Sequence, residues 1–161
     1  MSVEVVDQAR TRELRRAVLR PHLSLDDVLP GDEVPDAIHF AALDGDDGAD
    51  GTDGDGAIGA CFIYPEPCPW RSGPAWRLRQ MATAESRRGT GVGAAVLAGV
   101  VAYIAERGGG TLWLHARQVA VPFYARNDLR VHGEPFVEND LPHREMWRPV
   151  DNLSAAPSRP S

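Results

Sequence analysis

The sequence contains no lysine, because all 17 of its basic residues are arginine. These arginines form no run of the kind that binds nucleic acid, so a nucleic-acid partner is not expected. No apolar run approaches the roughly 20 residues that span a membrane, and residues 1–16 lack the apolar core of a signal peptide. We therefore expect no membrane partner and a cytoplasmic protein.

Cysteine and metal-ligand patterns are also scarce. The only two cysteines, Cys61 and Cys68, are too few and too far apart for a C-x-x-C metal or redox motif, so we expect both to be reduced and structural. The five histidines show no H-E-x-x-H or comparable ligand spacing. No metal is predicted.

The net charge of −6 comes from one segment. Residues 44–56 (DGDDGADGTDGDG) hold six aspartates and no base, so the rest of the chain is close to neutral. No register of this segment gives the calcium-binding pattern D-x-[DN]-x-[DN]-G with a later glutamate. We predict a flexible loop here, within a single domain over residues 1–150, and a disordered tail at 151–161.

Hydrophobic periodicity predicts both helices and strands. A strand at 76–83, a helix at 94–107 and a strand at 111–117 follow one another, and such a crossover places the two strands parallel and adjacent. The other expected elements are a helix at 11–19, an irregular connection at 22–35, a hairpin of strands 37–43 and 57–64, helical turns at 120–126, and strands at 130–134 and 144–150.

Residues 88–93 (RGTGVG) lie between the strand at 76–83 and the helix at 94–107. Glycines without a Cβ let backbone N–H groups crowd around a phosphate, and a helix N-terminus adds roughly half a positive charge. Arg88 adds a full charge at the rim. We interpret this segment as an anion-binding loop rather than as a turn whose glycines serve conformation alone.

Residues 88–93 also resemble the (R/Q)-x-x-G-x-(G/A) loop with which N-acetyltransferases of the GNAT superfamily bind acetyl-CoA. Downstream, LHARQVAVPFYARNDL at 114–129 is similar to the family segment L-N-A-(R/Q)-x-x-A-x-x-F-Y-x-x-x-G-F. The stretch from GEPF at 133–136 to PHREM at 142–146 resembles the C-terminal G-E-x-F…P-H-x-x-M of one small bacterial branch. The chain departs from the pattern at His115, where asparagine is common, and at 127–129, where the family usually has a Leu-Gly-Phe turn.

The resemblance implies an α+β GNAT fold with a mixed central sheet of six to seven strands, a splay between the fourth and fifth strands, and helices on both faces. It implies acetyl-CoA as co-substrate. The pyrophosphate would lie on Arg88 and the loop N–H groups, and the pantetheine arm would pair with the main chain of Met81 and Thr83. The cofactor-binding residues expected on this basis are Met81, Thr83, Arg88, Gly89, Thr90, Gly91, Val92 and Gly93.

Tyr124 matches the family's helix tyrosine, which protonates the leaving CoA thiolate. A phenol with a reference pKa of about 10 is a suitable donor to a thiolate whose conjugate acid lies near about 8.5. The amine must also lose a proton before it attacks the thioester. His115 and His143 are the candidates for that base, and each could instead be a structural histidine. Arg77 is expected to pair with a neighbouring carboxylate.

The function predicted from these features is transfer of the acetyl group of acetyl-CoA to a primary amine by direct attack in a ternary complex. The acceptor would be a small molecule or a peptide, and family resemblance alone suggests a homodimer. Two alternatives stay open. The unusual residues 127–129 favour a non-catalytic CoA-binding module, and residues 89–94 formally satisfy the G-x-G-x-x-A of NAD(P)-binding oxidoreductases, although no acid ends the next strand to hold a ribose.

Overall fold

The computed structural model describes residues 1–19, 34–44 and 56–153, which fall into two compact units. The first unit comprises Met1–Tyr64 and Gln80–Val100, and the second comprises Pro65–Arg79 and Val101–Ser161. The flexible loop predicted within 44–56, most of the connection at 22–35 and most of the tail at 151–161 lie outside the described residues. The single domain over residues 1–150 stays a prediction.

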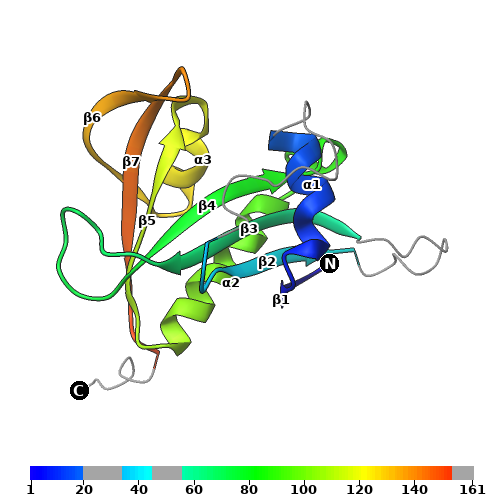
Figure 1. The fold of residues 1–161 in the computed structure, drawn as a ribbon, viewed down its shortest axis with the longest axis horizontal. Coiled ribbons are helices and arrows are strands. Elements are labelled where there is room, and N and C mark those ends of the chain that lie inside the picture. Colours follow the sequence, from blue (N-terminus) through cyan, green and yellow to red (C-terminus); the bar gives the residue numbers. More distant parts are fainter. Residues whose placement is uncertain (20–33, 45–55, 154–161) are drawn as a thin grey trace. The chain divides into compact units, whose positions relative to one another are not determined.

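The first unit is built on antiparallel strands (Figure 1). Strand β2 (Ile38–Leu43) pairs with β1 (Ser2–Val6) on one side and with β3 (Ala57–Pro65) on the other. The predicted hairpin is therefore confirmed. The unit also contains helix α1 (Ala9–Leu19).

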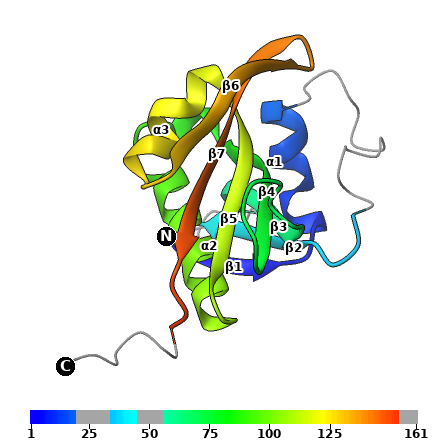
Figure 2. The same ribbon diagram turned by 90° about the vertical axis from the view of Figure 1, so that its left-hand side faces the viewer.

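Helix α2 (Val92–Glu106) packs its first turns closely on β3. A Cβ added at Gly59 would lie 2.5 Å from Cγ1 of Val92, so only glycine permits this approach. Val92 and Val96 are buried there, with 3% and 0% of their surface exposed. Figure 2 shows α1 on the opposite side of these strands from α2. The start of α2 is thus fixed by core packing on β3.

The second unit contains a mixed sheet. Strand β5 (Gly110–Arg117) is antiparallel to β7 (Leu141–Val150), which in turn is antiparallel to β6 (Arg130–Glu138). On its other side, β5 is parallel to the first residues of β4 (Ala75–Thr83), as the crossover predicts. Hydrogen bonds link the seven strands in the order β1-β2-β3-β4-β5-β7-β6.

The ladder between β4 and β5 is short. It consists of three residue pairs, from Ala75 with Thr111 to Arg77 with Trp113. A short ladder is what a splay between the fourth and fifth strands requires. The α+β fold with a mixed sheet of seven strands and three α-helices is confirmed, the third helix being α3 (Val121–Arg126).

Sequence patterns misplaced the two ends of the sheet. Strand β1 was not predicted, because it is a short edge strand with three of its five residues exposed and little buried surface to show. Strands β6 and β7 are longer than predicted. Strand β6 continues past Gly133, which has a φ of 74° and lies at a bulge inside the strand.

The base of the β2–β3 hairpin is closed by a hydrogen bond from Asp44 N–H to Gly56 O of 3.4 Å. Replacing residues 45–55 by Asn-Gly should therefore keep CoA affinity and turnover unchanged, while the shorter loop adds about 1 kcal/mol or less to stability. Isothermal titration with CoA and thermal denaturation check this result. Lost activity in the deletion variant would give the aspartate-rich segment a functional role.

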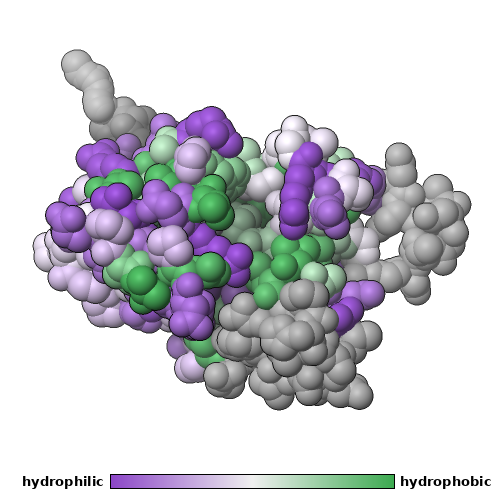
Figure 3. All heavy atoms as spheres, turned by 90° about the horizontal axis from the view of Figure 1, so that it is seen from above, coloured by the Kyte–Doolittle hydropathy of each residue, from purple (hydrophilic) through white to green (hydrophobic). Residues whose placement is uncertain are grey.

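No helix within residues 1–19, 34–44 and 56–153 is long and apolar enough to cross a membrane. On the face drawn in Figure 3, hydrophilic and hydrophobic residues are interspersed.

Candidate active site

The predicted anion-binding loop connects β4, through the short 3-10 helix η2 (Glu85–Arg87), to α2. Gly89 and Gly91 have φ values of 79° and 91°, which L residues rarely adopt. A Cβ at either position would meet no heavy atom within 4 Å. These glycines are therefore required by the backbone path, and they leave open space beside it.

The helix begins with the bond from Ala95 N–H to Gly91 O, at 3.0 Å. The N–H groups of Val92, Gly93 and Ala94 precede this first bond, so they have no acceptor within the helix. Together with the helix dipole, they form the positive end of a 15-residue helix. This geometry suits an anion such as a phosphate.

The remaining loop residues close and flank this turn. Thr90 donates both its N–H and its hydroxyl to Arg87 O, so its polar groups hold the loop together. Arg87 forms an ion pair with Asp44 at the base of the β2–β3 hairpin. Arg88 is exposed, and within the described residues its guanidinium makes no ion pair. It is available to a ligand at the loop.

Strand β4 carries an irregularity just before Met81 and Thr83, the predicted main-chain contacts for pantetheine. Gln80 has a φ of 60°, in the left-handed region. Its side-chain oxygen accepts a hydrogen bond of 3.0 Å from Arg15 of α1, a residue with only 1% of its surface exposed. A buried arginine thus holds the Gln80 side chain where β4 departs from regular strand geometry.

Tyr124 lies in α3, and 6% of its surface is exposed. The turn that ends this helix is well formed despite its unusual sequence. Asp128 takes the left-handed conformation, with a φ of 75°, and the N–H groups of Asn127 and Leu129 both donate to Tyr124 O. Aspartate tolerates this conformation better than most residues. The departure at 127–129 therefore leaves the position of Tyr124 on its helix intact.

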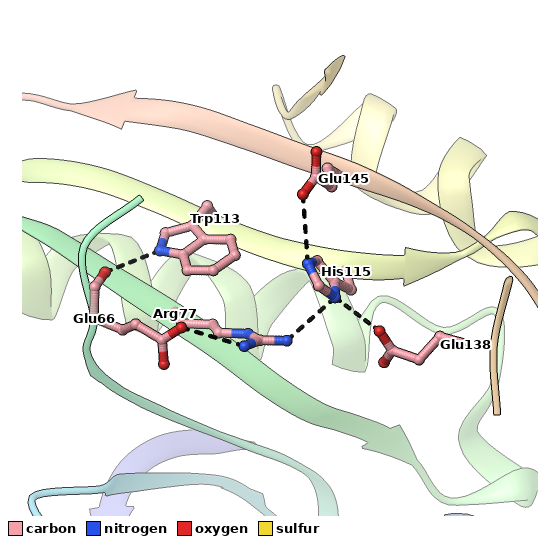
Figure 4. A network of polar contacts seen from close by, with 6 residues as sticks. All are labelled: Glu66, Arg77, Trp113, His115, Glu138 and Glu145. Carbon is pink, nitrogen blue, oxygen red and sulfur yellow. Dashed lines mark hydrogen bonds and ion pairs between the residues drawn. The ribbon is translucent and has the colours of Figure 1, made fainter. Parts of the chain in front are cut away.

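A polar network lies over the second unit's sheet, with residues from strands β4, β5, β6 and β7 and from the connection that follows β3 (Figure 4). Arg77 donates to the Glu66 carboxylate at 3.3 Å, which confirms its predicted pairing with a neighbouring carboxylate. Its guanidinium also lies over the Trp113 ring, 4.9 Å from the centroid, and the Trp113 indole N–H donates to Glu66 O at 3.0 Å. Glu66 therefore accepts hydrogen bonds from both Arg77 and Trp113.

His115 is the centre of this network. Its Nδ1 lies 2.9 Å from Glu138 Oε1 and 3.2 Å from Arg77 Nη2, and its Nε2 lies 3.7 Å from Glu145 Oε2. Burial raises the pKa of Glu138, but the hydrogen bond from His115 and the charges of His115, His143 and Arg77 outweigh burial and lower that pKa. Glu138 is therefore an ionised acceptor at neutral pH.

His143 is placed differently. It lies on β7 with 5% of its surface exposed, and its Nδ1 donates to Leu141 O at 2.9 Å. The Phe136 ring is a neighbour of both histidines, with its centroid 5.0 Å from that of His115 and 5.8 Å from that of His143. Of the two predicted bases, only His115 contacts carboxylates in the described part of the chain.

Sequence reasoning did not identify Glu138 and Glu145. Glu145 is directly opposite His115 in the β5–β7 ladder, and Glu138 reaches His115 from β6 beyond a bulge. Both residues lie within or beside the segment from 133 to 146 that carries the C-terminal match, which is the signal that could have found them. The described residues hold no group of three or more His, Cys, Asp or Glu side chains suited to a metal ion.

Comparison with known proteins defines the class. Residues 70–148 match the family model of an acetyltransferase (GNAT) domain. An uncharacterized N-acetyltransferase of Bacillus subtilis, YitI, is 28% identical over 88% of this chain and 89% of its own. An aminoglycoside 6'-N-acetyltransferase solved with coenzyme A has a TM-score of 0.69 at 17% identity and full coverage of both chains. ElaA of Escherichia coli has a TM-score of 0.63 at 18% identity, covering 88% of each chain.

The family model describes an acetyltransferase domain, YitI and the aminoglycoside enzyme are described as N-acetyltransferases, and both solved structures share the fold of this chain. The chain belongs to the GNAT superfamily, and it is an acetyl-CoA-dependent N-acetyltransferase.

Proposed function

We propose that this enzyme moves the acetyl group of acetyl-CoA to a primary amine by direct attack in a ternary complex, without an acetylated enzyme intermediate. The observation that carries the proposal is the loop at 88–93, where two left-handed glycines and a helix N-terminus leave open space for a pyrophosphate. Arg88 would supply the balancing side-chain charge. The main-chain groups of Met81 and Thr83 would pair with the pantetheine arm.

Tyr124 would protonate the departing thiolate. Its burial and the bonded turn at 127–129 support this role, since the helix that carries it is held by three N–H groups at its C-terminal end. The same closed turn removes the reason for expecting a non-catalytic module, because the altered residues build the turn with a left-handed Asp128.

An amine panel tests the proposal. Protein and acetyl-CoA are mixed with diamines, amino acids, aminoglycosides and short peptides, and free thiol and acetylated product are measured. Burial raises the pKa of both Cys61 and Cys68, so the protein's own thiols should react slowly with the thiol reagent, and a reaction without amine sets the background. We expect thiol and acetyl-amine in equal amounts with at least one acceptor. CoA binding without product from any amine would contradict the proposal.

A further inference from the structure

We propose that His115 accepts the proton of the acceptor ammonium through Nε2, and that Glu138 is a positioning residue that keeps the proton of the neutral ring on Nδ1. This inference rests on the proposed acetyl transfer. It assigns the base that the sequence left open between two histidines, and it adds a residue outside the predicted site.

Arg77 and Glu138 compete for Nδ1 of His115. A guanidinium can only donate a hydrogen bond, whereas an ionised carboxylate can only accept one. Arg77 Nη2 at 3.2 Å would therefore need a lone pair on Nδ1, and Glu138 Oε1 at 2.9 Å needs a proton there. Both bonds cannot exist at once.

Three features favour the bond to Glu138. It is the shorter contact, it joins the ring to a carboxylate that is ionised at neutral pH, and Arg77 already has a partner in Glu66. A protonated Nδ1 leaves the lone pair of the neutral ring on Nε2. Glu138 thereby selects the tautomer.

The surroundings of Nε2 suit a proton acceptor. The nearest carboxylate oxygen, Oε2 of Glu145, lies at 3.7 Å, which is too long for a hydrogen bond but close enough to stabilise a positive ring. The His115 side chain is 21% exposed, so an amine can approach it, whereas His143 is nearly buried. The other charged groups facing His115 are Arg77 on β4 and Glu138 on β6, and the titratable His143 contacts the same Phe136 ring.

The proton balance is as follows. The ammonium gives one proton to His115 Nε2, and the free amine attacks the thioester carbonyl carbon. The new C–N bond forms and the C–S bond breaks, so the electron pair goes to sulfur, which takes a proton from Tyr124. The nitrogen's second proton restores the phenol. The imidazolium then releases its proton to solvent, so each turnover yields an amide, CoA thiol and one proton.

The first test uses no turnover. Nitrogen-15 NMR of the imidazole rings, with His115 assigned from the His115→Gln spectrum, should show the Nδ1–H tautomer when the ring is neutral. In Glu138→Gln, whose amide can donate as well as accept, a mixture of tautomers is expected. An Nε2–H tautomer in the wild type would overturn the inference, whether or not acetyl transfer is observed.

The second test measures kcat/KM against pH with an amine accepted in the panel. We expect His115→Ala to lose about 100-fold or more in kcat/KM, and Glu138→Gln to lose about 10-fold to 100-fold. Glu138→Asp should restore part of the rate. Glu106→Gln removes another carboxylate, 59% exposed on α2, and should change nothing. An unchanged rate and limb in His115→Ala would refute the inference while leaving acetyl transfer established.

Discussion

Gly91→Asp is expected to abolish CoA binding, with affinity reduced by at least about 100-fold. Two effects act together. The backbone at Gly91, with a φ of 91°, costs an L residue about 1–2 kcal/mol, and the new carboxylate would occupy the open space beside the loop and repel a pyrophosphate. Isothermal titration with CoA measures the loss.

The chain offers a matched control for this variant. Gly73, in the connection between β3 and β4, has a φ of 94°, and a Cβ there also meets nothing within 4 Å. Gly73→Asp therefore adds the same charge and a similar backbone strain without altering the loop at 88–93. Its thermal midpoint should fall as much as that of Gly91→Asp, while CoA affinity is kept. Equal losses of affinity in both variants would mean that the loop is not the phosphate site.

Tyr124→Phe is expected to lower kcat by about 100-fold, at the lower end of what a positioned proton donor contributes. The variant keeps the aromatic ring that contacts Phe123, with centroids 5.0 Å apart, so the packing of α3 should survive. CoA affinity should be nearly unchanged. Steady-state kinetics with the accepted amine, together with titration of CoA, separate the two quantities.

A further comparison distinguishes acid catalysis from a packing role. Phe123→Leu removes the ring beside Tyr124 and keeps the phenol. Its main effect should therefore be on thermal stability rather than on kcat. An acetyl thioester whose leaving thiol has a lower pKa needs less protonation of the thiolate. With this substrate, the loss of kcat in Tyr124→Phe should therefore be smaller. A wild-type rate in Tyr124→Phe would remove the phenol from the mechanism.

Local sequence signals predicted the parts of the site that are contiguous in the chain. The loop at 88–93 is recognised by a strand, glycines and a helix in succession. Hydrophobic periodicity predicted the strand and the helix, and the glycines are visible in the sequence between them. The end of α2 at Glu106, close to the 107 predicted, and the parallel arrangement of β4 and β5 followed from equally local patterns. Such features depend on backbone preferences, which one sequence displays.

The network around His115 could not be predicted in the same way. It depends on the register that places Glu145 opposite His115, and on the bulge after His132 that lets β6 continue to Glu138. Hydrophobic periodicity predicts neither the register of two strands nor the position of a bulge. Likewise, the left-handed Gln80 forms a side-chain hydrogen bond with a buried arginine from a distant helix, a contact that strand propensity does not reveal.

The absence of lysine has a practical consequence for an enzyme that handles a reactive thioester. Arg77 and Arg87 serve as cations in ion pairs, Arg88 offers its charge at the loop, and no side chain in the chain carries a primary amine. Spontaneous acetylation of lysine therefore cannot obscure mass spectra of the protein after turnover. Any acetyl adduct on a side chain would report a hydroxyl, thiol or imidazole, and peptide mapping separates such an adduct from acetylation of the amine at Met1, so mass spectrometry distinguishes direct transfer from a covalent intermediate.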